Sequence, residues 1–406
     1  MSQSAPANQS SLHGINVLSH DTQDFSLVLG GPLFQFFRRA HLSDDAEGMV
    51  WRRIIVISLF AWLPPALISL ISGEFYQGVK IPFLHDMAVH VRFLLAIPLL
   101  IAAELLVHLR LRKVVQQFLL RELIPEHAKA KFDAAIHSAI NLRNSIKAEI
   151  ILITLVYAIG FFIWRHYAVI ETDTWYATLN GDQLQLTIAG YWYAFASLPV
   201  FQFLLIRWYF RLFIWARFLW QVSKIDLQLL PTHSDRLGGL AFLSGTFYAF
   251  TPLAAAHGAM LAALLANRIF FQGAMLTDFK AEIALTVIVT QLLILAPLLV
   301  FAPQLAQAQR DAKREYGILV MRHNREFEEK WLRQQTNTES PLGNPDMSSL
   351  VDLGSSFDVV QSMRAVPVNK DAVIFLAVAT LAPLVPLALT MMPLEELLKK
   401  LAGMLF

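Results

Sequence analysis

The 406-residue chain contains no cysteine, and only 16% of its residues are charged. The absence of cysteine excludes disulfide bonds, thiolate metal sites and cysteine nucleophiles. The charged fraction is low because a soluble protein typically has roughly 25% charged residues. Since 56% of the residues are hydrophobic and the mean hydropathy is +0.49, the composition indicates an integral membrane protein.

The sequence also lacks the motifs of several function classes. The net charge is only +2 and no segment resembles a basic recognition helix or a zinc finger, so we expect no nucleic acid as a partner. The sequence has no signature of a nucleophilic triad, and Gly238-Gly239 lacks the Lys and Ser/Thr of a phosphate-binding loop. No apolar stretch carries a histidine pair at helical spacing, so the sequence favours no metal and no cofactor.

Seven apolar stretches are long enough to cross a bilayer, whose hydrocarbon core of about 30 Å requires roughly 20 helical residues. They are 54–73, 91–108, 149–165, 186–206, 239–266, 283–303 and 372–392. The sequence therefore predicts an all-α membrane protein with about seven transmembrane helices, six of them in a bundle over 54–303.

The ends of the chain are expected to lie outside this bundle. Residues 1–24 are polar and lack the apolar core of a signal peptide, which predicts a disordered segment. The short apolar run 25–37 contains Gly30-Gly31-Pro32, so we interpret 25–53 as an interfacial segment. The amphipathic pattern of 393–406 predicts a helix on the outer membrane surface.

The distribution of lysine and arginine predicts the orientation. Of the 33 basic residues, 26 fall in the N-terminal segment or in the loops after the second, fourth and sixth spans. Basic residues near span ends are retained on the cytoplasmic side. We therefore expect a cytoplasmic N-terminus and an external C-terminus, in a bacterial inner membrane.

Helical periodicity continues beyond the membrane on the predicted cytoplasmic side. Apolar residues at three- and four-residue steps predict a helical hairpin over 107–150, interrupted at Pro125. The region 304–371 is expected to contain a long helix over 304–333 and a loop over 334–349. Apolar stripes outside the membrane need covering, so these extensions favour a cytoplasmic helical layer and a homo-oligomer.

Few polar side chains lie within the predicted spans, and ionisable groups there are candidates for function. Glu104 is followed by His108 and Arg112 at four-residue steps, which fits either a proton- or cation-handling stripe or an ion-pair ladder at a helix end. His257 lies among alanines and fits either a proton relay or a hydrogen bond to a neighbouring helix. The milder candidates for a polar pathway are Gln202 and Gln291.

A third group of polar residues directly precedes the fifth span. Pro231, Thr232 and Asp235 form a helix-start signature. The same turn at a helix N-terminus could hold an anion or a lipid headgroup. The candidate residues for that second reading are Thr232, His233, Asp235, Arg236, Gly238 and Gly239.

These features favour a homo-oligomeric ion channel or small-solute transporter that uses Glu104 and His257. One alternative is a membrane sensor or scaffold that acts through its cytoplasmic helices. Another is an inner-leaflet lipid- or anion-binding protein, or an enzyme, that uses the 232–239 turn. The expected partners are membrane lipids, further copies of the chain, and a small ion or solute.

Overall fold

The computed structural model describes residues 25–32, 35, 50–167, 173–180, 183–333, 340 and 343–388. It is 79% helical with almost no sheet, which confirms the all-α prediction. The predicted disordered segment 1–24 and outer helix 393–406 lie outside the described residues, as does most of the predicted interfacial segment 25–53.

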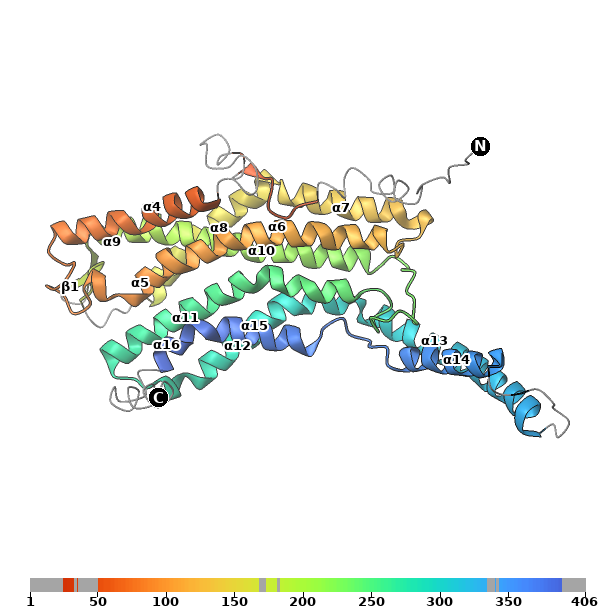
Figure 1. The fold of residues 1–406 in the computed structure, drawn as a ribbon. Helices are drawn as coiled ribbons and strands as arrows, with labels where there is room; N and C mark the ends of the chain where they lie inside the picture. Colours follow the sequence, from red (N-terminus) through yellow and green to blue (C-terminus); the bar gives the residue numbers. More distant parts are fainter. Residues whose placement is uncertain are drawn as a thin grey trace, which may run out of the picture.

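The main helices form an elongated bundle (Figure 1). They are α4 (Val50–Ile71), α5 (Met87–Val91), α6 (Ile97–Leu120), α7 (Lys129–Arg143), α8 (Ile146–Tyr167), α9 (Ile188–Trp192), α10 (Leu198–Val222), α11 (Thr251–Gln272), α12 (Lys280–Leu295), α13 (Ala302–Phe327), α14 (Pro345–Gln361), α15 (Lys370–Leu381) and α16 (Val385–Ala388). A short antiparallel hairpin, β1 (Ala177–Asn180) and β2 (Gln183–Leu186), pairs Ala177 with Leu186 between α8 and α9. The sequence had not indicated these strands.

In the part of the chain that the structure describes, six helical segments are long and apolar enough to cross a membrane. They are Val50–Ile71, Met87–Leu120, Ile188–Val222, Ala241–Gln272, Leu276–Arg333 and Lys370–Ala388. Each overlaps one of the predicted spans, and the remaining predicted span, 149–165, falls within the 22-residue helix α8. The chain is therefore a multi-pass membrane protein.

Prolines mark the irregular turns within these long helices. A π-helical turn, Arg92–Ala96, precedes Pro98, and another, Tyr193–Ser197, precedes Pro199. A 3₁₀ segment, Ala296–Phe301, contains Pro297 and joins α12 to α13. Proline lacks an N–H and clashes with the carbonyl four residues earlier, so each helix changes its hydrogen-bond register there instead of ending.

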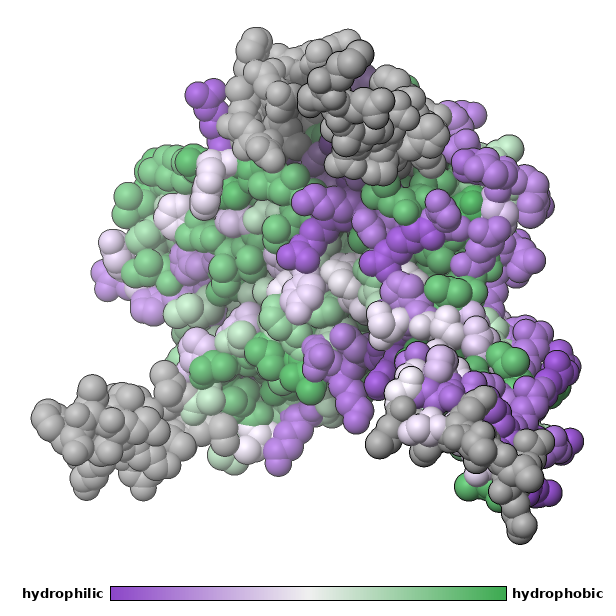
Figure 2. Space-filling view, turned by 45° about the vertical axis from the view of Figure 1, so that its right-hand side comes forward, coloured by the Kyte–Doolittle hydropathy of each residue, from purple (hydrophilic) through white to green (hydrophobic). Residues whose placement is uncertain are grey.

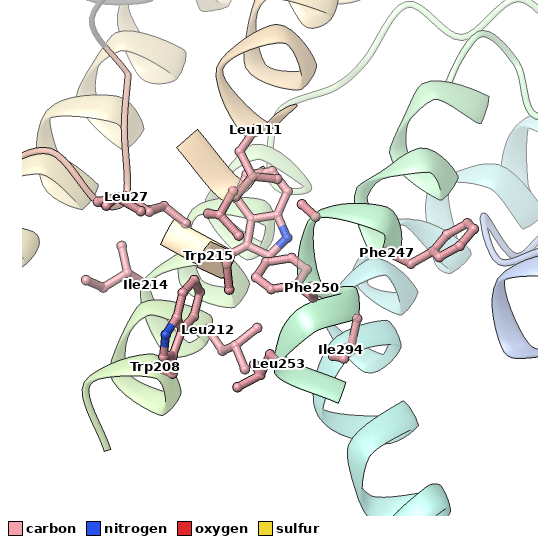
Figure 3. Close-up of a cluster of buried hydrophobic side chains, with 14 of the residues drawn as sticks. Leu27, Leu111, Trp208, Leu212, Ile214, Trp215, Phe247, Phe250, Leu253 and Ile294 are labelled. Atoms are coloured by element: carbon pink, nitrogen blue, oxygen red, sulfur yellow. The ribbon is translucent and has the colours of Figure 1, made fainter. Parts of the chain in front are cut away.

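The apolar core joins segments that are far apart in the sequence. Leu27, Leu111, Trp215 and Phe250 come from four different segments and are all nearly inaccessible to solvent (Figure 3). The segment that contains Leu27 was expected at the membrane interface, but Phe25, Leu27 and Val28 are buried inside protein. Helix α4 begins at Val50, four residues before the predicted span. The described residues 25–28 are therefore covered by protein and residues 50–53 form the first turn of α4, while the interfacial position of 25–53 stays a prediction.

The predicted cytoplasmic end carries a projecting arm formed by α13 and α14 (Figure 1). Helix α7 packs against α10 at the same end of the molecule. Hydrophilic residues gather toward the side that carries the arm, whereas hydrophobic residues cover much of the remaining surface (Figure 2). The sequence had assigned 334–349 to a loop, but α14 already begins at Pro345 because Asn344 caps its first turn.

Candidate functional site

Glu104 on α6 lies between two buried arginines. Its Oε2 atom accepts a hydrogen bond of 2.9 Å from Nη1 of Arg53 on α4, and its Oε1 atom lies 2.7 Å from Nη2 of Arg211 on α10. All three side chains are less than a tenth exposed. Charge-assisted bonds of this length on both oxygens make Glu104 a strongly held counter-charge for two arginines.

Further charged side chains lie close to these three residues. Arg207, one helical turn before Arg211, places Nη2 3.8 Å from Oε1 of Glu149 on α8. At the end of α7, burial and then the positive charge of Arg211 lower the pKa of Arg143 to about 10. We call this set the arginine–glutamate cluster; its members are Arg53, Glu104, Arg143, Glu149, Arg207 and Arg211.

The segment around Gly30 and Gly31 lies directly on the arginine–glutamate cluster. The Arg143 guanidinium donates to the carbonyl of Ser26. A Cβ atom on Gly31 would lie 3.2 Å from Oε1 of Glu149 and 3.1 Å from the carbonyl oxygen of Arg143. The φ angle of Gly31 is +88°, a conformation that other residues rarely adopt. Glycine is therefore required here by both backbone conformation and space.

The expected stripe of Glu104, His108 and Arg112 does not form one interacting group. His108 places Nδ1 2.9 Å from the Ser26 hydroxyl, which ties α6 to the buried N-terminal segment. Arg112 is exposed, whereas Glu104 contacts the arginines described above. The structure thus gives Glu104 partners from other helices instead of partners from its own.

His257 lies on a different side of α10 from Glu104. Its Nδ1 atom is 2.7 Å from the carbonyl oxygen of Leu253, and its Nε2 atom is 2.8 Å from the Tyr209 hydroxyl. Tyr209 and Arg211 are two residues apart on α10, so they point to nearly opposite faces of that helix. The contacts of Glu104 and His257 therefore do not bring the two residues together.

The two glutamines both lie at helix contacts. Gln291 on α12 donates a hydrogen bond of 3.2 Å from Nε2 to the carbonyl of Val373 in α15. The Oε1 atom of Gln202 lies 3.9 Å from the position that a Cβ on Gly160 would occupy, so this side chain lies against α8. Both positions match the inter-helix role that polar side chains commonly have in membrane bundles.

The 230–240 segment is an irregular loop and not the start of a helix. Asp235 uses both carboxylate oxygens to accept backbone N–H groups, from Leu237 at 2.8 Å, Gly239 at 3.1 Å and Ala241 at 3.1 Å. Regular structure resumes only with the 3₁₀-helix Ala241–Phe250, ahead of α11. The predicted helix start at Pro231–Asp235 is therefore wrong, although Asp235 does bind unpaired N–H groups.

This loop forms hydrogen bonds with the end of α6 and with the segment that follows α14. Arg121 at the end of α6 donates to the carbonyl of Gly239, and the backbone N–H of Arg364 donates to the carbonyl of Arg236. His233 Nδ1 lies 3.0 Å from Oδ1 of Asp235. Gly238 has a positive φ and lies against Leu229 and Met363, and Gly239 likewise has a positive φ. Thr232, another of the candidate residues, is partly exposed.

We expect Asp235→Ala to lower the free energy of unfolding by about 1–3 kcal/mol at pH 7, because backbone N–H groups lose their acceptor. Burial alone would raise the pKa of Asp235, but the backbone N–H groups and His233 hold it below its ordinary value. A lowered folded-state pKa means that the carboxylate stabilises the fold above the unfolded pKa of about 3.9 and loses this effect as the pH falls through the folded pKa.

The measurement for this prediction is thermal unfolding of both proteins in lipid nanodiscs at pH 7 and pH 3. The difference in unfolding temperature between the wild type and Asp235→Ala should be smaller at pH 3 than at pH 7. The exposed Asp226 supplies the control, and Asp226→Ala should match the wild type at both values. An equal difference in unfolding temperature at both pH values would contradict the assigned role of the carboxylate.

A second buried carboxylate, Asp86, joins segments at the predicted outer end, and no sequence motif had indicated it. Its Oδ2 atom accepts from Nε1 of Trp175 at 3.0 Å, and its Oδ1 atom accepts from Nδ2 of Asn267 at 2.9 Å. The same residue caps α5 by accepting the N–H of Ala88. These contacts join three segments, so Asp86 has a clear structural role.

Comparison of the whole chain with known protein families, curated proteins and solved structures finds no match.

Proposed function

We propose that this multi-pass membrane protein is a channel or transporter for a small ion or solute. The observation that carries the proposal is the arginine–glutamate cluster, in which side chains of α4, α6, α8 and α10 bring buried charge together. Buried ionisable groups in membrane helices are costly and commonly belong to solute or ion pathways. The π-helical and 3₁₀ turns at the prolines support the proposal because such irregularities frequently accompany functional sites.

The topology within this proposal has seven spans, with α8 as the third. The N-terminus is cytoplasmic and the C-terminus is external, in a bacterial inner membrane, as the distribution of basic residues favours. In this orientation the arginine–glutamate cluster lies at the cytoplasmic boundary of the bundle. Glu104 holds Arg53 and Arg211 in place, and His257 stabilises the contact between α10 and α11 through Tyr209.

A flux assay in proteoliposomes tests the proposal. Vesicles loaded with a panel of inorganic cations, inorganic anions and small organic acids should lose at least one of them faster than protein-free vesicles. Glu104→Gln, compared at equal amounts of folded protein, should reduce that flux at least tenfold. The matched control is Glu126→Gln, since Glu126 pairs with Lys129 at an exposed position. Absence of flux for every member of the panel would reject the transport function.

Assembly through the α13–α14 arm is a second candidate role, favoured by the apolar side chains that the arm exposes. Ile318, Leu319 and Met321 on α13 and Val351 on α14 are each close to half exposed or more. Isolated exposed apolar residues are ordinary, but here they recur along a helix that extends beyond the bundle (Figure 1). The proposed partner is a second copy of the chain, which would cover this surface.

Disulfide crosslinking tests this role. Because the chain has no native cysteine, any disulfide must form through the introduced residue. In native-like lipid, Met321→Cys should give an oxidised dimer, whereas Leu285→Cys on α12 should give less than a tenth as much. Leu285 is a suitable control because it is similarly exposed but lies within the membrane bundle. A monomer at every arm position tested would contradict assembly through the arm.

A further inference from the structure

The described arginine–glutamate cluster has more positive than negative charge. Three arginines pair with the carboxylates of Glu104 and Glu149, and Arg143 adds a fourth positive charge near Arg211, which gives the cluster a net charge of +2. Glu104 is already bonded to two of the arginines. Buried charges are stable only when opposite charges and hydrogen bonds compensate them. The composition of the cluster therefore favours an additional negative group.

Arg53 supplies an independent sign of a missing partner. Its Nη1 atom is bonded to Glu104, but its Nε atom is inaccessible to solvent and has no hydrogen-bond partner among the residues that the structure describes. The residue as a whole is 5% exposed. Buried N–H groups are nearly always paired in proteins, and a charged guanidinium makes an unpaired one especially unfavourable. An acceptor atom beside Arg53 would remove this defect.

The position and chemistry of the cluster indicate what the acceptor is. Arg207 lies 3.8 Å from Glu149, beyond ordinary hydrogen-bond length, so its guanidinium has capacity for a closer acceptor. Guanidinium groups match the oxygens of phosphate and carboxylate groups in paired hydrogen bonds.

We infer that the arginine–glutamate cluster binds an oxyanion through Arg53 and Arg207, while Glu104 holds Arg211 in place beside it. The oxyanion is a phosphate or carboxylate group. It can belong to a soluble anion or to an anionic lipid headgroup, because the predicted cytoplasmic boundary brings the cluster to headgroup depth. For a soluble anion the inference deepens the proposed transport function by naming the substrate class. The binding itself is measured without flux.

The experiment measures binding with two probes on the full chain. Protein in zwitterionic nanodiscs is titrated with inorganic phosphate, and separately with vesicle-derived phosphatidylglycerol, and bound ligand is followed by native mass spectrometry. We expect one probe to saturate a single site. Arg207→Gln and Arg53→Lys should each weaken that binding at least tenfold. The matched control is Arg314→Gln, an exposed arginine on the arm, which should bind as the wild type does.

A second measurement uses the wild type alone and does not depend on whether the variants fold. The saturating probe should slow hydrogen exchange in peptides around 50–55 and 204–211, and leave the 313–325 peptide of the arm unchanged. Binding of phosphate identifies a soluble anion, and binding of phosphatidylglycerol alone identifies a lipid headgroup. The inference is overturned if neither probe binds, if the two variants bind as tightly as the wild type, or if protection falls only outside α4 and α10. Binding without flux would instead keep the site and reject transport.

Discussion

Glu104→Ala is expected to lower the free energy of unfolding by about 3–5 kcal/mol, because it leaves Arg53 and Arg211 charged and buried without their shared carboxylate. The loss of a partner from a buried ion pair costs far more than the loss of an exposed one. Solvent and salt screen an exposed pair, and its two side chains lose conformational freedom when they pair. The buried position of Glu104 between α4 and α10 therefore predicts a large effect.

Two further variants serve as comparisons for this prediction. Glu126→Ala removes the exposed pair with Lys129 and should change stability by less than about 1 kcal/mol. Glu104→Gln keeps the side-chain volume and can still accept hydrogen bonds. Its free energy of unfolding should therefore lie between those of the wild type and Glu104→Ala. The measurement is thermal unfolding in nanodiscs at pH 7. Equal unfolding temperatures for Glu104→Ala and Glu126→Ala would contradict the buried geometry.

The sequence could predict the helical bundle because one physical requirement, the length needed to cross a bilayer, leaves a simple pattern in the chain. Six apolar stretches coincide with helical segments of sufficient length and hydropathy. Glu104 could be singled out for the same reason, since a carboxylate within an apolar run is conspicuous. The number of spans and their orientation stay predictions.

The partners of Glu104 could not be identified in this way. Arg53 directly precedes the first predicted span and Arg207 directly follows the fourth, where basic residues are ordinary cytoplasmic signals. Their burial depends on the packing of α4, α8 and α10, which no local pattern encodes. One signal was available: Arg207 and Arg211 are four residues apart, so they share a helix face within an otherwise apolar and aromatic segment.

Local signatures explain the two errors of secondary structure. The Thr232-x-x-Asp235 pattern was interpreted as a helix start, but Gly238 and Gly239 take positive φ angles that fold the chain back around the Asp235 carboxylate. The reverse error occurred at Asn344-Pro345, which was interpreted as part of a loop. Asparagine at the N-cap and proline at the first helical position are a standard helix start, and α14 begins there.

Gly258→Ala should strongly destabilise the bundle although it adds only one methyl group. Gly258 on α11 lies against the backbone of α15, and a Cβ there would lie 1.8 Å from the carbonyl oxygen of Thr380. That atom belongs to helix backbone, so it cannot move aside as a flexible side chain could. Small residues permit this kind of close approach between membrane helices, and any larger residue must separate them.

We therefore expect Gly258→Ala to lower the free energy of unfolding by at least about 3 kcal/mol, at the upper end of the range for overpacked cores. The matched control is Gly354→Ala in the middle of α14, where a Cβ would meet no atom within 4 Å. Alanine is the better helix former by roughly 1 kcal/mol, so this second change should leave stability unchanged or increase it. Unfolding temperatures in nanodiscs and the fraction of monodisperse protein after purification measure both effects. Since the two substitutions add the same methyl group to a helical glycine, a difference between them reports the contact of α11 with α15, and equal behaviour would show that this contact is looser than the structure describes.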